Sequence, residues 1–267
     1  MKTEISVFHN LNEASYALAS FIAETARKTV ESKGRFFMAL SGGKTPEVFY
    51  GLLASEFADS IPWQSVHLFW GDERYVLKDH PDSNYALAFR TLISKVPLIV
   101  QNIHRIPTEL KPQRKAAEAY QATLHKFFST PKKDPLVSFD VILLGMGEDG
   151  HTAALFPENP ALREKERWVV PTFSSSPFSP QPRISLTLPV INGSRTGIFL
   201  VSGSKKTRTL RSILINPKEV RHIYPAAMVC PREKLFWIID QDALNGISYS
   251  DISYEVIKEG NKDQFPA

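Results

Sequence analysis

The sequence contains one cysteine, no long apolar run and no dense block of basic residues, and each absence excludes a class of protein. With Cys230 as its single thiol, the chain can form neither an internal disulfide nor a cysteine-rich metal site, which is typical of a protein of the reducing cytoplasm. No window reaches the roughly 20 apolar residues of a membrane span, and the opening MKTEISVFHN has no signal-peptide core. The sequence predicts a cytoplasmic protein without a membrane partner.

The charge balance is also modest. Thirty-two basic and 28 acidic side chains leave a net charge of +4. Most such side chains lie on the surface, and without a clustered basic stretch we expect no nucleic-acid partner. A slight positive bias suits an anionic metabolite, which the field of the protein would steer towards its site. Because the 267 residues show no internal repeat and no long linker, we expect one domain, 1–267.

Segments that predict strands and segments that predict helices alternate along the chain. Several strand segments are apolar at consecutive positions, as in strands that are covered on both faces. The expected strands are 5–8, 35–40, 65–70, 139–145, 167–170, 183–188, 196–201 and 235–240. The expected helices are 12–33, one that opens at 45–46, 84–94, 113–128 and 204–215. The alternation predicts an α/β fold with a doubly wound, mostly parallel, Rossmann-like sheet between helices.

Particular residues mark the ends of these helices. Gly34 is a suitable C-terminal stop for the first helix, and Ser83 can cap the helix 84–94. Thr45 is expected as an N-cap, with Pro46 at the first helical position. The Ser- and Pro-rich segment 171–182 is either an exposed connection or a flap beside a site. The apolar surroundings of Cys230 in AAMVCP predict a core position rather than a nucleophile.

The most informative segment is a glycine-rich loop that follows the strand 139–145. Its GMGEDG (145–150) fits the G-x-G-x-x-G pattern, but Pro157 interrupts the helix that a dinucleotide site needs, and Glu166 precedes the next strand instead of closing it. The next residue, His151, can exchange a proton near neutral pH. A lone histidine is more often structural, but this one follows a loop at the carboxyl end of a strand, where α/β proteins bind ligands.

A second glycine-rich segment, SGGKTP (41–46), lies between a strand and a helix. It ends like a nucleotide-binding P-loop, but Met38 stands where that motif has its first glycine, so NTP binding is not expected. Two glycines before the positive end of a helix dipole still suit a phosphate. The alternative is a tight turn without a ligand.

A third loop, in LFWGDERYV (68–76), places Asp72, Glu73 and Arg74 just beyond another strand. Arg74 either pairs with a neighbouring carboxylate or offers its planar guanidinium to an anion. The three loops are expected to converge on one edge of the sheet. No cluster of His, Asp or Glu has the spacing of metal ligands, and the D-G-H pair of Asp149 and His151 alone does not make a metal site. The sequence also has no G-x-S-x-G motif, so it gives no support for a serine hydrolase.

Six motifs in this order cover most of the chain: SGGKTP, WGDERYV, DSNY (82–85), GMGEDGHTAALFP, RISLTLPVIN and GSKK (203–206). They resemble the glucosamine-6-phosphate isomerase/6-phosphogluconolactonase family. The deaminases of that family typically continue the histidine motif with Ile-Ala-Phe-Asn-Glu-Pro and have Asp-Glu-Tyr at 72–74. Residues 152–157 and Arg74 differ from that pattern, so the resemblance favours the lactonases.

The resemblance implies hydrolysis of 6-phospho-D-glucono-1,5-lactone to 6-phospho-D-gluconate, the second step of the oxidative pentose phosphate pathway, without a metal or organic cofactor. It implies that His151 is the general base and that Arg74 stabilises the oxyanion or holds the product carboxylate. Asp72 and Asp149 would orient these two side chains. The implied substrate-binding residues are Ser41, Gly42, Gly43, Arg183 and Lys206. Lys205 is the alternative to Lys206.

Two other functions remain open at this stage. A deaminase-like sugar-phosphate isomerase would use Asp72 to take a proton from carbon. A non-catalytic sugar-phosphate sensor would be expected to carry a DNA-binding helix pair, whereas this chain opens with the strand at 5–8. The expected partner is a small sugar-phosphate lactone, and the protein is expected to be a monomer or a small homo-oligomer.

Overall fold

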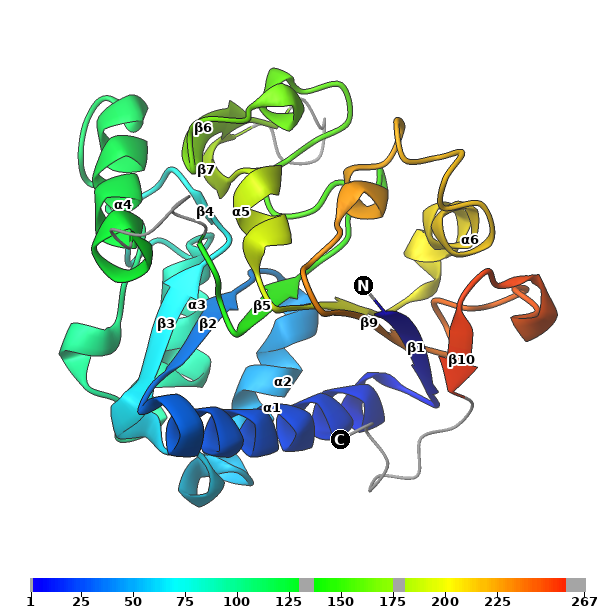
Figure 1. Ribbon diagram of the computed structural model, residues 1–267, viewed down its shortest axis with the longest axis horizontal. Coiled ribbons are helices and arrows are strands. Elements are labelled where there is room, and N and C mark those ends of the chain that lie inside the picture. Colours follow the sequence, from blue (N-terminus) through cyan, green and yellow to red (C-terminus); the bar gives the residue numbers. More distant parts are fainter. Residues whose placement is uncertain (1, 130–136, 175–180, 258–267) are drawn as a thin grey trace.

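The computed structural model describes residues 2–129, 137–174 and 181–257. Its central element is a seven-stranded sheet in the order β10-β1-β9-β8-β5-β2-β3, and every neighbouring pair is parallel (Figure 1). The strands are β1 Lys2–Phe8, β2 Phe36–Leu40, β3 Val66–Trp70, β5 Val141–Leu144, β8 Thr196–Val201, β9 Lys234–Asp240 and β10 Glu255–Ile257. The predicted α/β fold with a mostly parallel sheet is confirmed.

A second, antiparallel sheet corrects one expectation. It contains β4 Asp72–Arg74, β7 Pro182–Leu186 and β6 Val169–Phe173, in that order. The strands expected at 167–170 and 183–188 therefore exist but leave the main sheet, because they pair with each other as a hairpin. The segment 171–182 begins and ends in these two strands, and its centre, 175–180, lies outside the described residues.

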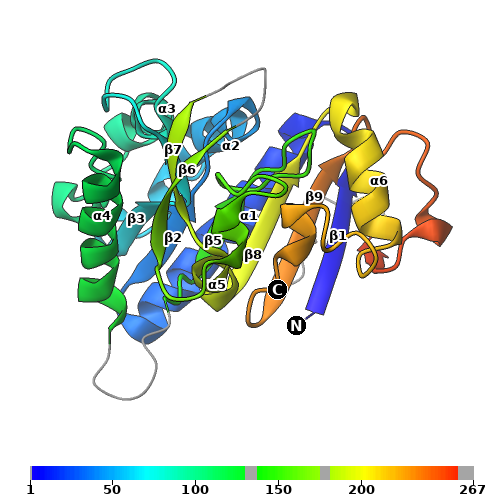
Figure 2. The ribbon, with the colours of Figure 1, turned by 90° about the horizontal axis from the view of Figure 1, so that it is seen from above.

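Six α-helices surround the main sheet among the described residues. They are α1 Leu11–Lys33, α2 Lys44–Ser55, α3 Asn84–Thr91, α4 Gln113–Phe128, α5 Leu188–Gly193 and α6 Thr207–Ile215. Helices α1 and α2 pack together on one face, while α5, α6 and the small sheet lie on the other (Figures 1 and 2). Short 3₁₀ turns occupy 58–60, 63–65, 93–95, 100–102, 160–163, 204–206, 225–228 and 249–251. The helix expected at 204–215 thus starts as such a turn.

Two of the three helix-end predictions are confirmed. Gly34 ends α1 in the left-handed conformation, with φ 74°, and the Ser83 side chain caps α3 by accepting a hydrogen bond from the Ala86 N–H. The prediction for Thr45 is wrong, because α2 begins one residue earlier, at Lys44, after Gly43. Gly43 has φ 99°, which an L side chain rarely adopts, so backbone freedom at this glycine leads the chain into the helix.

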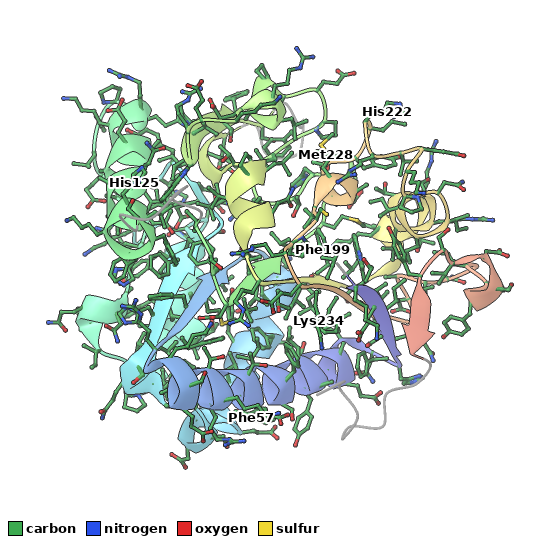
Figure 3. The ribbon with its side chains drawn as sticks, viewed as in Figure 1. Phe57, His125, Phe199, His222, Met228 and Lys234 are labelled. Atoms are coloured by element: carbon green, nitrogen blue, oxygen red, sulfur yellow. The ribbon has the colours of Figure 1, made fainter. Side chains whose placement is uncertain are left out.

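One hydrophobic cluster contains buried side chains from both sheets. Within the main sheet, Phe199 of β8, which is labelled in Figure 3, stacks on Trp237 of β9, with ring centroids 4.0 Å apart. Cys230 is half-buried rather than fully in the core. The shared cluster agrees with the prediction of one domain, 1–267, which stays a prediction. No helix in the described ranges is long and apolar enough to cross a membrane.

The strand order creates a crevice between two neighbouring strands. From β2 the chain moves to β3 on one side, whereas from β5 it moves to β8 on the other. The connections therefore diverge between β2 and β5. In open α/β sheets, ligands bind at such a point, beyond the carboxyl ends of the strands. The loops that follow β2 and β5 are SGGKTP and the glycine-histidine loop.

Candidate active site

A cavity of about 200 Å³ opens at this crevice. It is smaller than the roughly 300–1,000 Å³ of pockets for drug-sized ligands, so it suits a small metabolite. The three loops predicted to converge do meet here. The lining includes every expected site residue except Asp149: Ser41, Gly42, Gly43, Asp72, Arg74, His151, Arg183 and Lys206.

His151 and Asp149 form a hydrogen-bonded pair at the cavity wall. The imidazole Nδ1 lies 2.6 Å from Asp149 Oδ1, and the same oxygen accepts the His151 backbone N–H at 3.1 Å. An ionised carboxylate only accepts hydrogen bonds, so in the neutral ring Nδ1 carries the proton and Nε2 keeps its lone pair. The ring lines the cavity and contacts Phe156, with centroids 4.6 Å apart. The pair therefore leaves one basic nitrogen available to a ligand.

The charge state of Asp149 follows from competing effects. Its partial burial acts to raise the pKa, but the hydrogen bond and the charge of His151, together with backbone N–H donors, outweigh this and lower the pKa. Asp149 is therefore ionised at neutral pH. In this state it fixes the tautomer of His151 and would stabilise the imidazolium formed when Nε2 takes up a proton.

The glycines of this loop make room for the pair. A Cβ atom on Gly147 would lie 2.2 Å from His151 Nδ1 and 2.6 Å from Asp149 Oδ1. Gly150 has φ 79°, and a Cβ there would lie 2.5 Å from the Tyr224 ring. The G-x-G-x-x-G spacing thus serves a tight turn that presents a histidine. Residues 151–156 form no helix, which agrees with the exclusion of a dinucleotide site.

The SGG loop, which also lines the cavity, is held in place by the Tyr50 side chain. The Tyr50 hydroxyl accepts a hydrogen bond from the Ser41 N–H at 3.1 Å and donates one to the Ser41 carbonyl at 2.6 Å. Gly42 packs directly against Asn84, since a Cβ on Gly42 would lie 1.7 Å from Asn84 Oδ1. Gly43 then opens α2, so the amino end of that helix lies at the cavity. Such a terminus attracts an anion.

The structure distinguishes Lys206 from Lys205. Lys206 lines the cavity, whereas Lys205 is exposed. Burial lowers the pKa of Lys206, and the charges of Asp240 and Glu148 oppose this change. Asp240, at the end of β9, also holds the loop before the lysine, because its carboxylate accepts hydrogen bonds from Ser202 Oγ and the Gly203 N–H. Of the two alternatives, Lys206 is the one that reaches the cavity.

Arg74 and Arg183 lie opposite each other in the β4–β7 ladder. The Arg74 Nη1 donates to the Asp82 carbonyl at 2.6 Å, and Asp72 lies 3.9 Å from the Arg183 guanidinium. The resemblance implied that Asp72 orients Arg74, whereas the ion-pair partner of Asp72 in the structure is Arg183. Asp72 and Arg74 are two positions apart on one strand and therefore share a face. The closer arginine to Asp72 is nevertheless Arg183, on the neighbouring strand β7.

Positive charge predominates in the cavity. Among the described residues, its lining contains the cationic side chains Lys44, Arg74, Arg183 and Lys206 against one carboxylate, that of Asp72. Burial lowers the pKa of Arg183, an effect that Asp72 opposes and Arg74 reinforces, but a guanidinium stays protonated in proteins. The site is therefore built for a ligand with more than one negative charge.

Sequence reasoning missed two residues at this site. Asn84 lines the cavity, and Glu73 is buried directly behind Asp72 and Arg74. Both occur in motifs that carry the family resemblance, WGDERYV and DSNY, which was the available signal. Their roles depend on contacts between β4 and α3, which the sequence pattern does not show.

Comparison with known proteins identifies the family. The sequence matches the family described as glucosamine-6-phosphate isomerases/6-phosphogluconolactonase over residues 9–237. A Synechocystis protein named 6-phosphogluconolactonase is 39% identical over 81% of this chain and 86% of its own length. An Arabidopsis thaliana protein named 6-phosphogluconolactonase 3, chloroplastic, is 37% identical over 85% of this chain and 70% of its own.

Solved structures agree. The 6-phosphogluconolactonase from Trypanosoma brucei superposes with a TM-score of 0.80 at 26% identity, over 92% of this chain and 99% of that one. The Thermotoga maritima enzyme gives 0.75 at 30% identity, over 90% and 100%. A monomeric glucosamine-6-phosphate deaminase gives 0.74 at 18% identity, a likeness of fold alone. This chain therefore belongs to the glucosamine-6-phosphate isomerase/6-phosphogluconolactonase family.

Proposed function

We propose that this protein is a 6-phosphogluconolactonase, which hydrolyses 6-phospho-D-glucono-1,5-lactone to 6-phospho-D-gluconate in the pentose phosphate pathway. The observation that carries the proposal is the Asp149–His151 pair, with 2.6 Å between Oδ1 and Nδ1, at the wall of a cavity lined mainly by cationic side chains. The curated relatives and several solved structures bear this name. A base and an anion site together are what hydrolysis of a phosphorylated lactone needs.

The reaction begins when Nε2 of His151 takes a proton from water as the water oxygen attacks the lactone carbonyl carbon. The tetrahedral intermediate then collapses, the bond from that carbon to the ring oxygen breaks, and the imidazolium returns its proton to this oxygen. The products are a carboxylic acid, which ionises, and a hydroxyl group. General base catalysis of this kind contributes about 10²–10⁴ in rate. Asp149 holds the ring throughout.

Arg74 is the proposed partner of the oxyanion. Its guanidinium lies at the cavity on β4, and only one of its five donors is needed for the bond to the Asp82 carbonyl. A preorganised donor at a developing oxyanion supplies about 3–4 kcal/mol of transition-state stabilisation. Arg183, buried beside Asp72, adds positive charge to the same wall and is a proposed substrate-binding residue.

The phosphate is proposed to bind between the SGG loop and Lys206. Replacing Lys206 by alanine should raise KM about 10–100-fold, because a charge-assisted hydrogen bond to a bound group contributes about 1.5–3 kcal/mol. The kcat should change little, since the lysine contacts no reacting atom. Steady-state kinetics of the Lys206→Ala protein measure both constants. Lys205→Ala, which removes the exposed neighbour, is the matched control and should leave KM unchanged.

One assay tests the function itself. Freshly generated 6-phosphogluconolactone is hydrolysed in weak buffer, and the base needed to hold the pH is recorded with and without the protein. We expect the protein to accelerate base consumption and to leave ammonia release from glucosamine 6-phosphate at background. Ammonia release with unaccelerated lactone hydrolysis would instead indicate the deaminase activity of the same family.

Some expectations remain predictions. In the described ranges, no group of three or more His, Cys, Asp or Glu side chains is placed to hold a metal ion. The absence of a cofactor, the monomeric or small oligomeric state and the lack of a nucleic-acid partner are untested. A cytoplasmic location is likewise a prediction, and several relatives are named as chloroplastic.

A further inference from the structure

Strand β4 presents its residues to two different surroundings. Asp72 and Arg74 lie opposite Ser185 and Arg183 of β7 and line the cavity. Glu73, between them, turns to the other face, since side chains alternate along a strand. Its side chain is almost fully buried, at 2% exposed, and is not part of the cavity lining. A buried carboxylate that does not itself line the cavity needs another explanation.

The Glu73 carboxylate accepts four hydrogen bonds. Oε1 accepts the backbone N–H of Arg74 and of Asn84, both at 2.7 Å. Oε2 accepts the Tyr85 N–H at 2.8 Å and the Ser83 hydroxyl at 3.0 Å. Three of these donors belong to the amino end of α3, where a negative charge is favoured. Glu73 thereby ties the backbone of Arg74 to the start of that helix.

Asn84 extends the connection across the cavity. Its Nδ2 donates to the Asp72 carbonyl at 2.8 Å, and its side chain packs on Gly42 so closely that no Cβ would fit there. Asn84 itself is 1% exposed. The start of α3 thus contacts both the strand that carries Arg74 and the loop proposed to hold phosphate.

We infer that Glu73 is a positioning residue for the proposed lactone hydrolysis, which fixes the backbone of Arg74 directly and the Gly42 loop through Asn84. The inference rests on the proposed function, in which Arg74 faces the oxyanion. It assigns a role to the central acid of the DER segment, and it explains why DSNY accompanies that segment.

Burial makes the ionised form of Glu73 less favourable than it is in water. Burial raises the pKa of Glu73 from the usual 4.5 to about 7. The N–H donors of Asn84, Tyr85 and Arg74 oppose part of this rise, whereas the negative charge of Asp72 adds to it. The pKa of Glu73 is higher in the folded protein than in the unfolded chain, so ionisation of this carboxyl lowers the free energy of unfolding. This loss of stability is complete above pH 7 and disappears as the pH falls towards 4.5. Ionisation of Glu73 therefore costs stability at neutral pH.

The test compares two buried glutamates. E73Q keeps the size of the side chain but gives one end donors instead of an acceptor. E4Q makes the same change at Glu4, which is 1% exposed on β1 and lies outside the cavity lining. With kinetics expressed per folded protein, we expect E73Q to lower kcat about 10–100-fold, as a displaced catalytic group does. KM should rise less, because Asn84 keeps its bond to the Asp72 carbonyl. E4Q should change neither constant.

A double-mutant cycle shows whether Glu73 acts through Arg74. In an Arg74→Ala background, E73Q should cause almost no further loss of kcat, because effects of residues that act as one unit are not additive. An equal fractional loss in both backgrounds would overturn the inference, as would a change in KM alone. If E73Q does not fold, S83A removes one donor to the same carboxylate, and its smaller loss of kcat should vanish in the same background.

Crystal structures of the wild-type protein and E73Q separate this inference from the proposed function. We expect the Arg74 guanidinium to leave the Asp82 carbonyl in the variant. If Arg74 has the same position in the wild-type and E73Q structures, the positioning role of Glu73 is contradicted, whatever the activity of the variant. A wild-type protein without lactonase activity contradicts the proposed function, and the position of Arg74 in the two structures then decides the inference by itself.

Discussion

Replacing His151 by alanine should lower kcat for lactone hydrolysis by roughly 10²–10⁴-fold, the usual contribution of a general base. The imidazole is the group whose Nδ1 is held by Asp149 at 2.6 Å and whose ring lines the cavity. Alanine removes the proton acceptor but leaves the SGG loop, Lys206 and Arg74 in place. Binding of 6-phosphogluconate should therefore be nearly unchanged, which calorimetric titration measures beside the kinetics.

The control for this variant is His222→Ala, which removes an exposed histidine at the periphery of the molecule (Figure 3). It should retain wild-type kcat. Asp149→Asn provides a second check, because asparagine can donate to Nδ1 and so favour the wrong tautomer. Its kcat should fall while the fold persists. Wild-type turnover in His151→Ala would refute the general-base role.

The site was predictable where short segments encode it. A strand that ends in glycines before a histidine or a helix has a local signature, and the carboxyl ends of parallel strands must share an edge. Ser41, Arg74 and His151 therefore met as expected. Lys206 was harder to place, since Lys205 has the same chemistry. Only the packing of the turn at 204–206 shows which lysine reaches the cavity.

The remaining features depend on contacts between distant segments. Asp72 was expected to orient Arg74, but its ion pair is with Arg183, which follows 111 positions later in the sequence. The small sheet in which β4 pairs with β7 also contains the two expected strands that are absent from the main sheet. Three polar residues, Asp-Glu-Arg, give no periodic signal for a strand, so neither β4 nor its pairing with β7 could be predicted.

Arg74 offers the second large effect. Arg74→Ala should lower kcat about 10²–10³-fold, because a lost oxyanion donor costs about 3–4 kcal/mol of transition-state stabilisation. Arg74→Lys should retain part of the activity, since lysine keeps the charge but not the planar fork. Arg90→Ala is the matched control: Arg90 lies on the neighbouring helix α3, and its exposed side chain is 3.8 Å from Glu47. It should behave as the wild type.

The balance between two constants shows what Arg74 does. If it stabilises the oxyanion, the substitution lowers kcat strongly and changes product inhibition by 6-phosphogluconate little, because the charge on that oxygen is greatest in the tetrahedral state. If it holds the product carboxylate, the inhibition constant rises and kcat is retained. The geometry favours the first outcome, since Arg74 is anchored by the Asp82 carbonyl and by Glu73 before any ligand binds. A fixed donor is the arrangement that stabilises a developing charge without reorganisation. An Arg74→Ala protein with weakened product inhibition and normal kcat would contradict this assignment.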